Sequence, residues 1–188
     1  MNEQKIEQVT ERKNELPLGA KEIWLAGGCF WGLEKYFSGV RGILFTSVGY
    51  ANGKVTSPSY ELVCSGTTGF AETVHVIYNP EESPLSFLLK LYMKAIDPTS
   101  VNRQGADVGE QYRTGIYYLN ESDLGVINDE IKRVGAEYNE PVVVEVKPLL
   151  NYFLAEDYHQ EYLKKNPEGY CHIGNKLCAA AWNSSPGK

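Results

Sequence analysis

Hydrophobic and polar positions alternate with two different periods along the chain, and together they predict strands and helices in a definite order. Strand-like runs occupy 23–26, 43–50, 72–78, 114–119 and 141–149. Helical spacing is found over 33–37, 84–96, 122–138 and 155–165, with a short helical piece at 60–64. Turn-rich loops are expected at 52–59 and 99–113, and the segment from residue 168 onward shows no convincing period.

The first six main elements follow the order strand, helix, strand, strand, helix, strand. This order matches the split βαβ pattern of ferredoxin-like sheets. We therefore expect an α+β fold of two layers, with a mixed sheet and an irregular C-terminal segment wrapped over it. The expected organisation is a polar N-terminal arm (1–21), one α+β domain (22–165) and a cysteine-bearing tail (166–188) packed on the same domain.

Composition narrows the classes of protein to which the chain could belong. It has 188 residues, of which 43% are apolar and 22% charged, and a net charge of −6. This charge argues against nucleic acid as the main partner, and no apolar run approaches the roughly 20 residues that span a bilayer. Residues 1–22 lack the apolar stretch of a signal peptide, so we expect a cytoplasmic location in which the four cysteines are thiols. We also expect a monomer.

The segment Gly27-Gly28-Cys29-Phe30-Trp31-Gly32 links the first strand to the first helix. A cysteine on such a turn lies near free backbone N–H groups and the positive end of the helix dipole, which lowers the pKa of its thiol. Glycines let the backbone turn sharply and let a substrate come close. The sequence predicts a nucleophile here, although a cysteine buried in an aromatic core is the common alternative.

The three histidines are the first candidates for a proton-transfer partner of such a nucleophile. His75 lies in the middle of a strand, His159 lies on the charged face of a predicted helix and is expected to be solvated, and His172 follows Cys171. A Cys–His hydrolase therefore stays open as an alternative. No cysteine or histidine cluster has the spacing of a zinc site and no phosphate-binding loop is present, so neither a metal nor another cofactor is expected.

Two further cysteines, Cys171 and Cys178, lie in the tail. A mobile tail could bring a distant thiol within disulfide distance of Cys29, whereas a rigid strand could not. Thiol redox chemistry, with attack by one cysteine and resolution by another, is therefore a second hypothesis.

At this point the motifs resemble a known family. Gly28-Cys29-Phe30-Trp31-Gly32 is similar to the signature of the A-type peptide methionine sulfoxide reductases. The resemblance continues through Ser57-Pro58-Ser59-Tyr60, Val63-Cys64-Ser65-Gly66, Gly69-Phe70-Ala71-Glu72, Arg103-Gln104-Gly105, Asp107-Val108-Gly109-Glu110-Gln111-Tyr112-Arg113, His159-Gln160-Glu161-Tyr162 and Lys165-Asn166-Pro167-Glu168-Gly169-Tyr170-Cys171. The set covers nearly everything from Ile23 to Cys178, and its order makes it specific.

The resemblance implies roles for residues that composition alone would leave unremarkable. Cys29 would be the nucleophile that attacks the sulfoxide sulfur, and Glu72 would be the acid that protonates its oxygen, with a pKa raised by an apolar site. Tyr60 and Tyr112 would hydrogen-bond the sulfoxide oxygen, and Asp107 would support this polar cluster. The implied enzyme is a peptide-methionine (S)-S-oxide reductase that acts on free or protein-bound substrate and repairs oxidised proteins.

The same resemblance implies an apolar pocket and a recycling route. Phe30 and Trp31 would hold the methyl group of the substrate. Cys29 would become a sulfenic acid and then form a disulfide with Cys171, and thioredoxin would be the reductant. Cys178 is a candidate recycling thiol, and Cys64 is expected to be a buried thiol with no catalytic role.

The chain departs from the family pattern at two positions. Phe70 and Val108 stand where many members have histidine, which removes an imidazole that could assist Glu72. Two more classes remain open: a peroxide-reducing thiol enzyme, and a non-catalytic module that binds oxidised methionine through the Phe30–Trp31 pocket.

Overall fold

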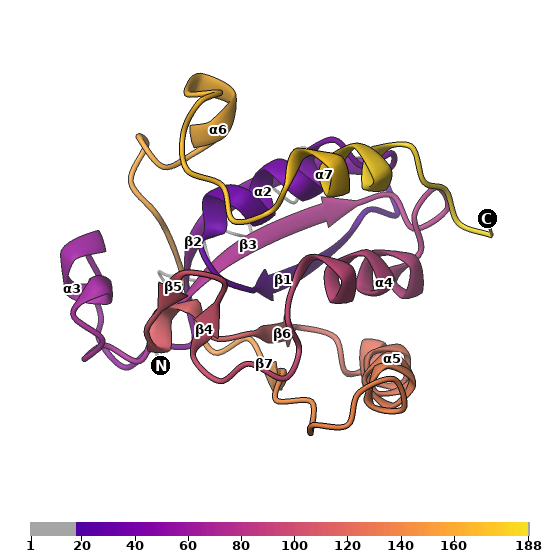
Figure 1. The fold of residues 1–188 in the computed structure, drawn as a ribbon, viewed down its shortest axis with the longest axis horizontal. Helices are drawn as coiled ribbons and strands as arrows, with labels where there is room; N and C mark the ends of the chain where they lie inside the picture. Colours follow the sequence, from indigo (N-terminus) through magenta and orange to yellow (C-terminus); the bar gives the residue numbers. More distant parts are fainter. Residues whose placement is uncertain (1–17, 188) are drawn as a thin grey trace.

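Residues 18–187, which the computed structural model describes, form a six-stranded mixed sheet with helices packed on it (Figure 1). The strands of this sheet are β1 (Lys21–Ala26), β2 (Ile43–Ala51), β3 (Ala71–Tyr78), β6 (Gly115–Tyr118), β7 (Glu145–Pro148) and β8 (Tyr152–Leu154). Their order is β7-β6-β1-β3-β2-β8. All neighbouring pairs are antiparallel except β6 and β7, which are parallel, so the prediction of a mixed sheet is confirmed.

Strand β3 lies between β1 and β2, which is the arrangement that the split βαβ pattern predicts. Its eight residues are all buried. Because both faces of β3 and both of its edges are covered, residues at its start are held away from water. Glu72 is the second residue of this strand.

Six helices surround the sheet within the described part of the chain: α2 (Phe30–Ser38), α3 (Tyr60–Cys64), α4 (Leu85–Ala95), α5 (Leu124–Gly135), α6 (Tyr162–Lys165) and α7 (Asn175–Trp182). Side chains of α2, α4, α5 and α7 join one face of the sheet in the main hydrophobic core. On α2 the buried positions include Phe30, Leu33 and Phe37, which recur at helical spacing and face the strands.

Helix α7 lies beside α2 (Figure 1), and the Trp182 indole N–H donates to the carbonyl of Tyr36 at 2.9 Å. The sequence pattern did not predict α7. The expected irregular tail therefore describes residues 166–174 but not Asn175–Trp182. Similarly, the helix predicted over 155–165 is wrong for most of its length, since only Tyr162–Lys165 is helical.

The long loop predicted at 99–113 contains short regular pieces. Strands β4 (Arg103–Gln104) and β5 (Asp107–Val108) pair with each other, and a 3-10 turn, η3 (Glu110–Tyr112), follows them. A second 3-10 turn, η4 (Glu121–Asp123), precedes α5.

The expected boundary of the N-terminal arm falls near the start of the sheet, since β1 begins at Lys21. Positions 1–17 of that arm lie outside the described residues. Within residues 18–187, no helix has the length and apolar character needed to cross a bilayer.

Candidate active site

Cys29 and Glu72 meet where helix α2 begins. Cys29 is the residue that caps the N-terminus of α2, directly after β1 and the two glycines. The backbone N–H of Phe30 donates to Glu72 Oε2 at 3.0 Å. Gly28 has φ of +76°, a conformation that favours glycine, and its N–H donates to the carbonyl of Tyr112 at 3.2 Å. The turn thus holds the candidate nucleophile, the candidate acid and the Tyr112 segment together.

Burial controls the charge of Glu72. The residue is 1% exposed, and loss of solvation raises the pKa of its carboxyl to about 8. The Phe30 N–H opposes this shift, and the nearby Asp107 carboxylate adds to it. Glu72 therefore carries its proton at pH 7, as an acid must.

Cys29 departs from the electrostatics expected of it. Burial, followed by the charge of Glu72, raises the pKa of its thiol, so the prediction of a lowered pKa is wrong for this reduced form. The backbone N–H groups of Trp31 and Gly32 do act in the predicted direction, but they are outweighed. A helix start stabilises a thiolate, and the surrounding apolar wall works against it.

The aromatic wall beside the sulfur is made by Phe30 and Trp31, as the motif predicts. Trp31 stacks on Tyr162 with ring centroids 3.8 Å apart, and its indole N–H donates to His159 Nδ1 at 3.0 Å. Phe30 is 5.1 Å from the His159 ring and 6.0 Å from the Tyr50 ring, measured between centroids. The residues predicted to hold a methyl group are thus locked in place by aromatic neighbours.

His159 is fully buried, so the expectation of a solvated histidine is wrong. The segment before α6 turns inward instead of continuing as a helix, and this places the imidazole between Trp31 and Tyr60. Burial lowers the pKa of His159 and keeps it neutral, as its acceptance of the Trp31 hydrogen bond requires.

Tyr60 and Tyr112 both lie near Glu72, whose charge contributes to the raised pKa of each phenol. Burial is the main cause of both shifts, so the two hydroxyls keep their protons and can donate hydrogen bonds. The Glu156 carboxylate fixes the start of α3, because it accepts from the Tyr60 N–H at 3.0 Å and from the Tyr50 hydroxyl at 2.7 Å.

Asp107 lies on β5, at the edge of this cluster. It accepts a hydrogen bond at 3.2 Å from the hydroxyl of Tyr170, which precedes Cys171 in the tail. Its charge also raises the pKa of Cys29 and Glu72. Asp107 thus connects the predicted polar cluster to the tail that carries the predicted resolving thiol.

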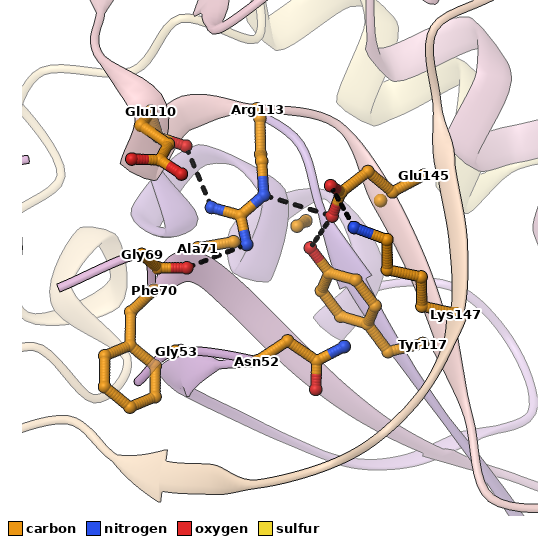
Figure 2. Close-up of polar contacts among 12 residues, drawn as sticks. Asn52, Gly53, Gly69, Phe70, Ala71, Glu110, Arg113, Tyr117, Glu145 and Lys147 are labelled. Atoms are coloured by element: carbon orange, nitrogen blue, oxygen red, sulfur yellow. Dashed lines mark hydrogen bonds and ion pairs between the residues drawn. The ribbon is translucent and has the colours of Figure 1, made fainter. Parts of the chain in front are cut away.

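Arg113 joins three segments behind the site (Figure 2). Its guanidinium donates to the carbonyl of Glu110 at 3.1 Å, to the carbonyl of Gly69 at 3.0 Å and to the carboxylate of Glu145 at 3.1 Å. Glu145 also accepts from Tyr117 and from Lys147. One planar side chain thereby fixes the turn that carries Tyr112 against the strand that carries Glu72.

The tail places Cys171 close to the start of α2. Its Sγ is 3.4 Å from the point where a Cβ on Gly32 would stand, so the absence of a side chain at Gly32 makes room for the tail. The Sγ donates to the carbonyl of Ile173 at 3.0 Å. Beside Cys171 lies a cavity of about 280 Å³, also lined by Lys35 and Asn175.

The other two cysteines differ in exposure. Cys178 is buried on α7, where burial and the charge of Cys171 raise the pKa of its thiol. Cys64 is exposed at the end of α3, so the expectation that it is buried is wrong. All four cysteines are free thiols in this structure.

Sequence reasoning did not single out two residues that the structure brings to the site: Arg113 and Glu156. Arg113 stands within the motifs of the family resemblance, as does His159, for which a solvated position was expected, and this was a signal available before the structure. Glu156 lies outside those motifs, and only its contacts to Tyr50 and Tyr60 reveal its role.

Comparisons with known proteins agree with this geometry. The model of the peptide methionine sulfoxide reductase family matches residues 21–185. The peptide methionine sulfoxide reductase MsrA of Lachnoclostridium phytofermentans is 54% identical over 164 residues, which is 87% of this chain and 99% of that protein. The reduced form of Mxr1 from Saccharomyces cerevisiae has a TM-score of 0.80 and 37% identity, covering 85% of this chain and 93% of its own. Mxr1 in complex with Trx2 has a TM-score of 0.55 and 24% identity, covering 78% and 87%.

The fold places a cysteine at the start of a helix, next to a buried carboxylic acid. This arrangement is typical of a thiol-based reductase. The family match and the relative at 54% identity make the assignment specific. The chain belongs to the peptide methionine sulfoxide reductase family.

Proposed function

We propose that this protein reduces methionine S-sulfoxide, free or in proteins, to methionine by thiol chemistry and so repairs oxidised proteins. The observation that carries the proposal is the buried Glu72 carboxyl, which has a pKa raised to about 8 and is hydrogen-bonded to the backbone at the Cys29 turn. A sulfoxide oxygen is a poor leaving group until it is protonated, and a neutral carboxyl at this point can supply the proton.

In the first step Cys29 attacks the sulfoxide sulfur while Glu72 protonates the oxygen. Tyr60 and Tyr112 donate hydrogen bonds to the same oxygen, and the Phe30–Trp31 wall holds the methyl group. The oxygen ends on Cys29 as a sulfenic acid, methionine leaves, and the thiol proton restores Glu72. The sulfur of Cys29 is oxidised by two electrons and the sulfur of the substrate is reduced by two.

In the second step the Cys171 thiol attacks the sulfenic acid, a disulfide forms and water departs. The short distance between Cys171 and the start of α2 supports this pairing. Thioredoxin is the reductant that we propose for the disulfide, and the solved complex of Mxr1 with Trx2 supports this choice. Cys178 could take over the disulfide from Cys171, although it must first leave its buried position on α7.

The test uses the two separated epimers of a methionine sulfoxide peptide with dithiothreitol as reductant. We expect the S epimer to be converted to methionine and the R epimer to persist. A protein that reduces neither epimer would contradict the proposal, and its thiol would then be assayed against peroxides and esters.

Cys29→Ser is the matched control, because a hydroxyl is not ionised at neutral pH and is a weaker nucleophile than a thiolate. We expect no turnover from this variant. Continued reduction in a single turnover would remove Cys29 from the mechanism. Trapping of an oxidised Cys29 after one turnover separates the reductase from a hydrolase or a simple binding module, neither of which oxidises its cysteine.

The remaining expectations belong to the same proposal. We propose a cytoplasmic monomer in which 22–165 is the catalytic domain and 166–188 is a tail packed on it. Sedimentation velocity at micromolar concentration tests the monomer, since a dimer would sediment as a larger species.

A further inference from the structure

His172 is a half-buried titratable residue that the mechanism so far leaves without a role. Both of its ring nitrogens are closed to solvent, and at most one of them is paired, with the backbone of Gly27. Native structures contain few buried polar atoms of this kind, because an unpaired one costs about 1–3 kcal/mol. An imidazole kept in such a state calls for an explanation.

The ring lies directly against the turn that carries Cys29. Its Nε2 is 3.0 Å from the point where a Cβ on Gly28 would stand, and its Nδ1 is 2.8 Å from the corresponding point on Gly32. The imidazole therefore spans the backbone on both sides of Cys29. Both glycines are needed here, since a side chain at either position would meet the ring.

Cys171 packs against the same glycine. Its Sγ is 3.4 Å from the Gly32 point and His172 Nδ1 is 2.8 Å from that point, so these two consecutive side chains of the tail both lie over Gly32. In this reduced form the thiol donates a hydrogen bond to the carbonyl of Ile173. The thiol proton must leave before the sulfur can attack another sulfur, because the thiolate is the nucleophile.

We propose that His172 is the base that accepts the Cys171 proton when the Cys29–Cys171 disulfide forms. This inference rests on the proposed function, which supplies the sulfenic acid. The Cys171 S–H bond breaks as the S–S bond forms, and the Cys29 S–O bond breaks as hydroxide leaves. His172 passes the proton to the departing hydroxide, which leaves as water. The Cys171 sulfur is oxidised and the Cys29 sulfur is reduced.

The surroundings keep His172 ready to accept a proton. Burial lowers the pKa of the imidazole below its ordinary value of about 6.5, so the ring is neutral at pH 7. Asp107 on β5 and the Gly27 backbone act against this shift. Asp107 is the charged group that acts on the ring, Cys171 is the titratable group that lies over the same glycine, and Gln104 beside Gly28 is neutral.

The experiment follows one turnover without a recycling reductant. Reduced protein is mixed with one equivalent of a methionine-S-sulfoxide peptide and quenched in acid at set times. Methionine formation reports the first step. Peptide mapping of the Cys29–Cys171 disulfide, together with trapping of the sulfenic acid by a 1,3-dione, reports the second step and separates it from pairings of Cys178.

In His172→Asn we expect methionine to form within about twofold of the wild-type rate. Disulfide formation should slow by roughly 10²–10⁴-fold, the contribution of a general base, and the sulfenic acid should accumulate. Lys176→Ala is the control, since this exposed residue stands in the same tail and its removal should change neither step.

The pH dependence separates a proton acceptor from a residue that only packs. In the wild type the rate of disulfide formation should increase as the pH is raised toward 6.5, because the imidazole loses its proton in this range, and should stay level at higher pH. In His172→Asn it should keep rising above pH 7, because no neighbouring base is left to take the thiol proton. A wild-type rate that keeps rising in the same way would overturn the proposal even if the variant failed to fold.

Other outcomes also test the role of His172. Equal disulfide rates in His172→Asn and wild type, or equal slowing of both steps in the variant, would contradict a role specific to Cys171. If the wild type forms no methionine, the proposed function fails and takes this inference with it. If methionine forms normally in both proteins but disulfide formation is unchanged, only the role of His172 fails.

Discussion

Glu72 and Cys29 share one buried corner, and a charge on Glu72 makes ionisation of Cys29 harder. After burial, the Glu72 carboxylate is the next cause of the raised pKa of the Cys29 thiol. When Glu72 is protonated, that repulsion disappears and the backbone N–H groups of Trp31 and Gly32 can favour the thiolate. The form of Glu72 that donates a proton is thus also the form that opposes ionisation of Cys29 least.

The pH dependence of the first step should follow Glu72. Because the carboxyl is protonated below its pKa of about 8, the single-turnover rate of methionine formation should fall about tenfold per pH unit above that value. Glu72→Gln keeps the shape of the side chain but holds no transferable acid proton. We expect it to lower the rate by roughly 10²–10⁴-fold and to remove this alkaline decline. A variant with the wild-type rate or the same decline would exclude Glu72 as the acid.

His159 should affect binding more than chemistry, since its Nδ1 holds the indole N–H of Trp31 at 3.0 Å. His159→Phe removes this acceptor, and one lost hydrogen bond of about 1 kcal/mol corresponds to a roughly fivefold higher KM. His159→Asn, which can place an oxygen near the position of Nδ1, should recover much of the loss. Steady-state kinetics test this, and a change confined to kcat would contradict it.

The identities of the site residues were predictable only in part. Cys29 follows from local pattern alone, because glycines, a strand and a helix start adjoin it in the sequence. Glu72 does not, since a carboxylate at a strand end is usually solvated and only the family motif separates the two cases. The net pKa shift of Cys29 and the burial of His159 depend on residues distant in the chain, so local spacing gave the wrong answer for both.

At the scale of elements, the site depends on how the loop before β3 is held against the turn η3. No strand pairing joins Gly69 to Glu110, and the Arg113 guanidinium links the two carbonyls directly (Figure 2). The guanidinium is braced from the other side by Glu145 of β7. The catalytic geometry is thus fixed by a fork-shaped side chain between otherwise separate segments.

Arg113→Met should therefore lower kcat/KM by about 10- to 100-fold, because small displacements of catalytic groups are costly. Arg113→Lys keeps the charge but cannot reach three acceptors, so we expect only partial recovery. Lys147→Met is the matched control, since it also removes a cation from Glu145 but touches neither Gly69 nor Glu110. Measurement of kcat/KM alongside urea unfolding separates a loss of catalytic positioning from a loss of stability. Equal losses of kcat/KM in Arg113→Met and Lys147→Met would refute this positioning role.

Element predictions failed where the pattern is short or its apolar residues are small. Helix α7 buries only Cys178 and Ala181, so its apolar face is too weak to show a period. Strand β8 has three residues and owes its place to pairing with β2. The long elements with large apolar side chains, β3 and α4, were predicted within a residue or two of their ends.

At the scale of the whole molecule, buried carboxyls tie stability to pH. Glu34 on α2 is buried and takes no part in the proposed chemistry, and its Oε2 accepts the N–H of Glu161 at 2.9 Å. Burial raises the pKa of Glu34 to about 7, and Glu72 is shifted in the same direction. The folded protein therefore holds protons that the unfolded chain releases near pH 4.5, so folding is favoured at low pH by these groups.

The free energy of unfolding should consequently decline as pH rises. Below about pH 4.5, Glu34 is neutral in both the folded and the unfolded state, so it does not make the free energy of unfolding depend on pH. Between pH 4.5 and 7 the unfolded chain loses its proton first, which removes about 1.4 kcal/mol of stability per pH unit, and above pH 7 the loss is complete. The side chain introduced by Glu34→Gln is neutral throughout. Between pH 5 and 8 the free energy of unfolding, measured in urea, should therefore decline in this variant by about 2 to 3 kcal/mol less than in the wild type. The decline caused by Glu72 is common to both proteins and cancels in this difference. Parallel curves for the two proteins would show that Glu34 ionises in the folded state as easily as in the unfolded chain.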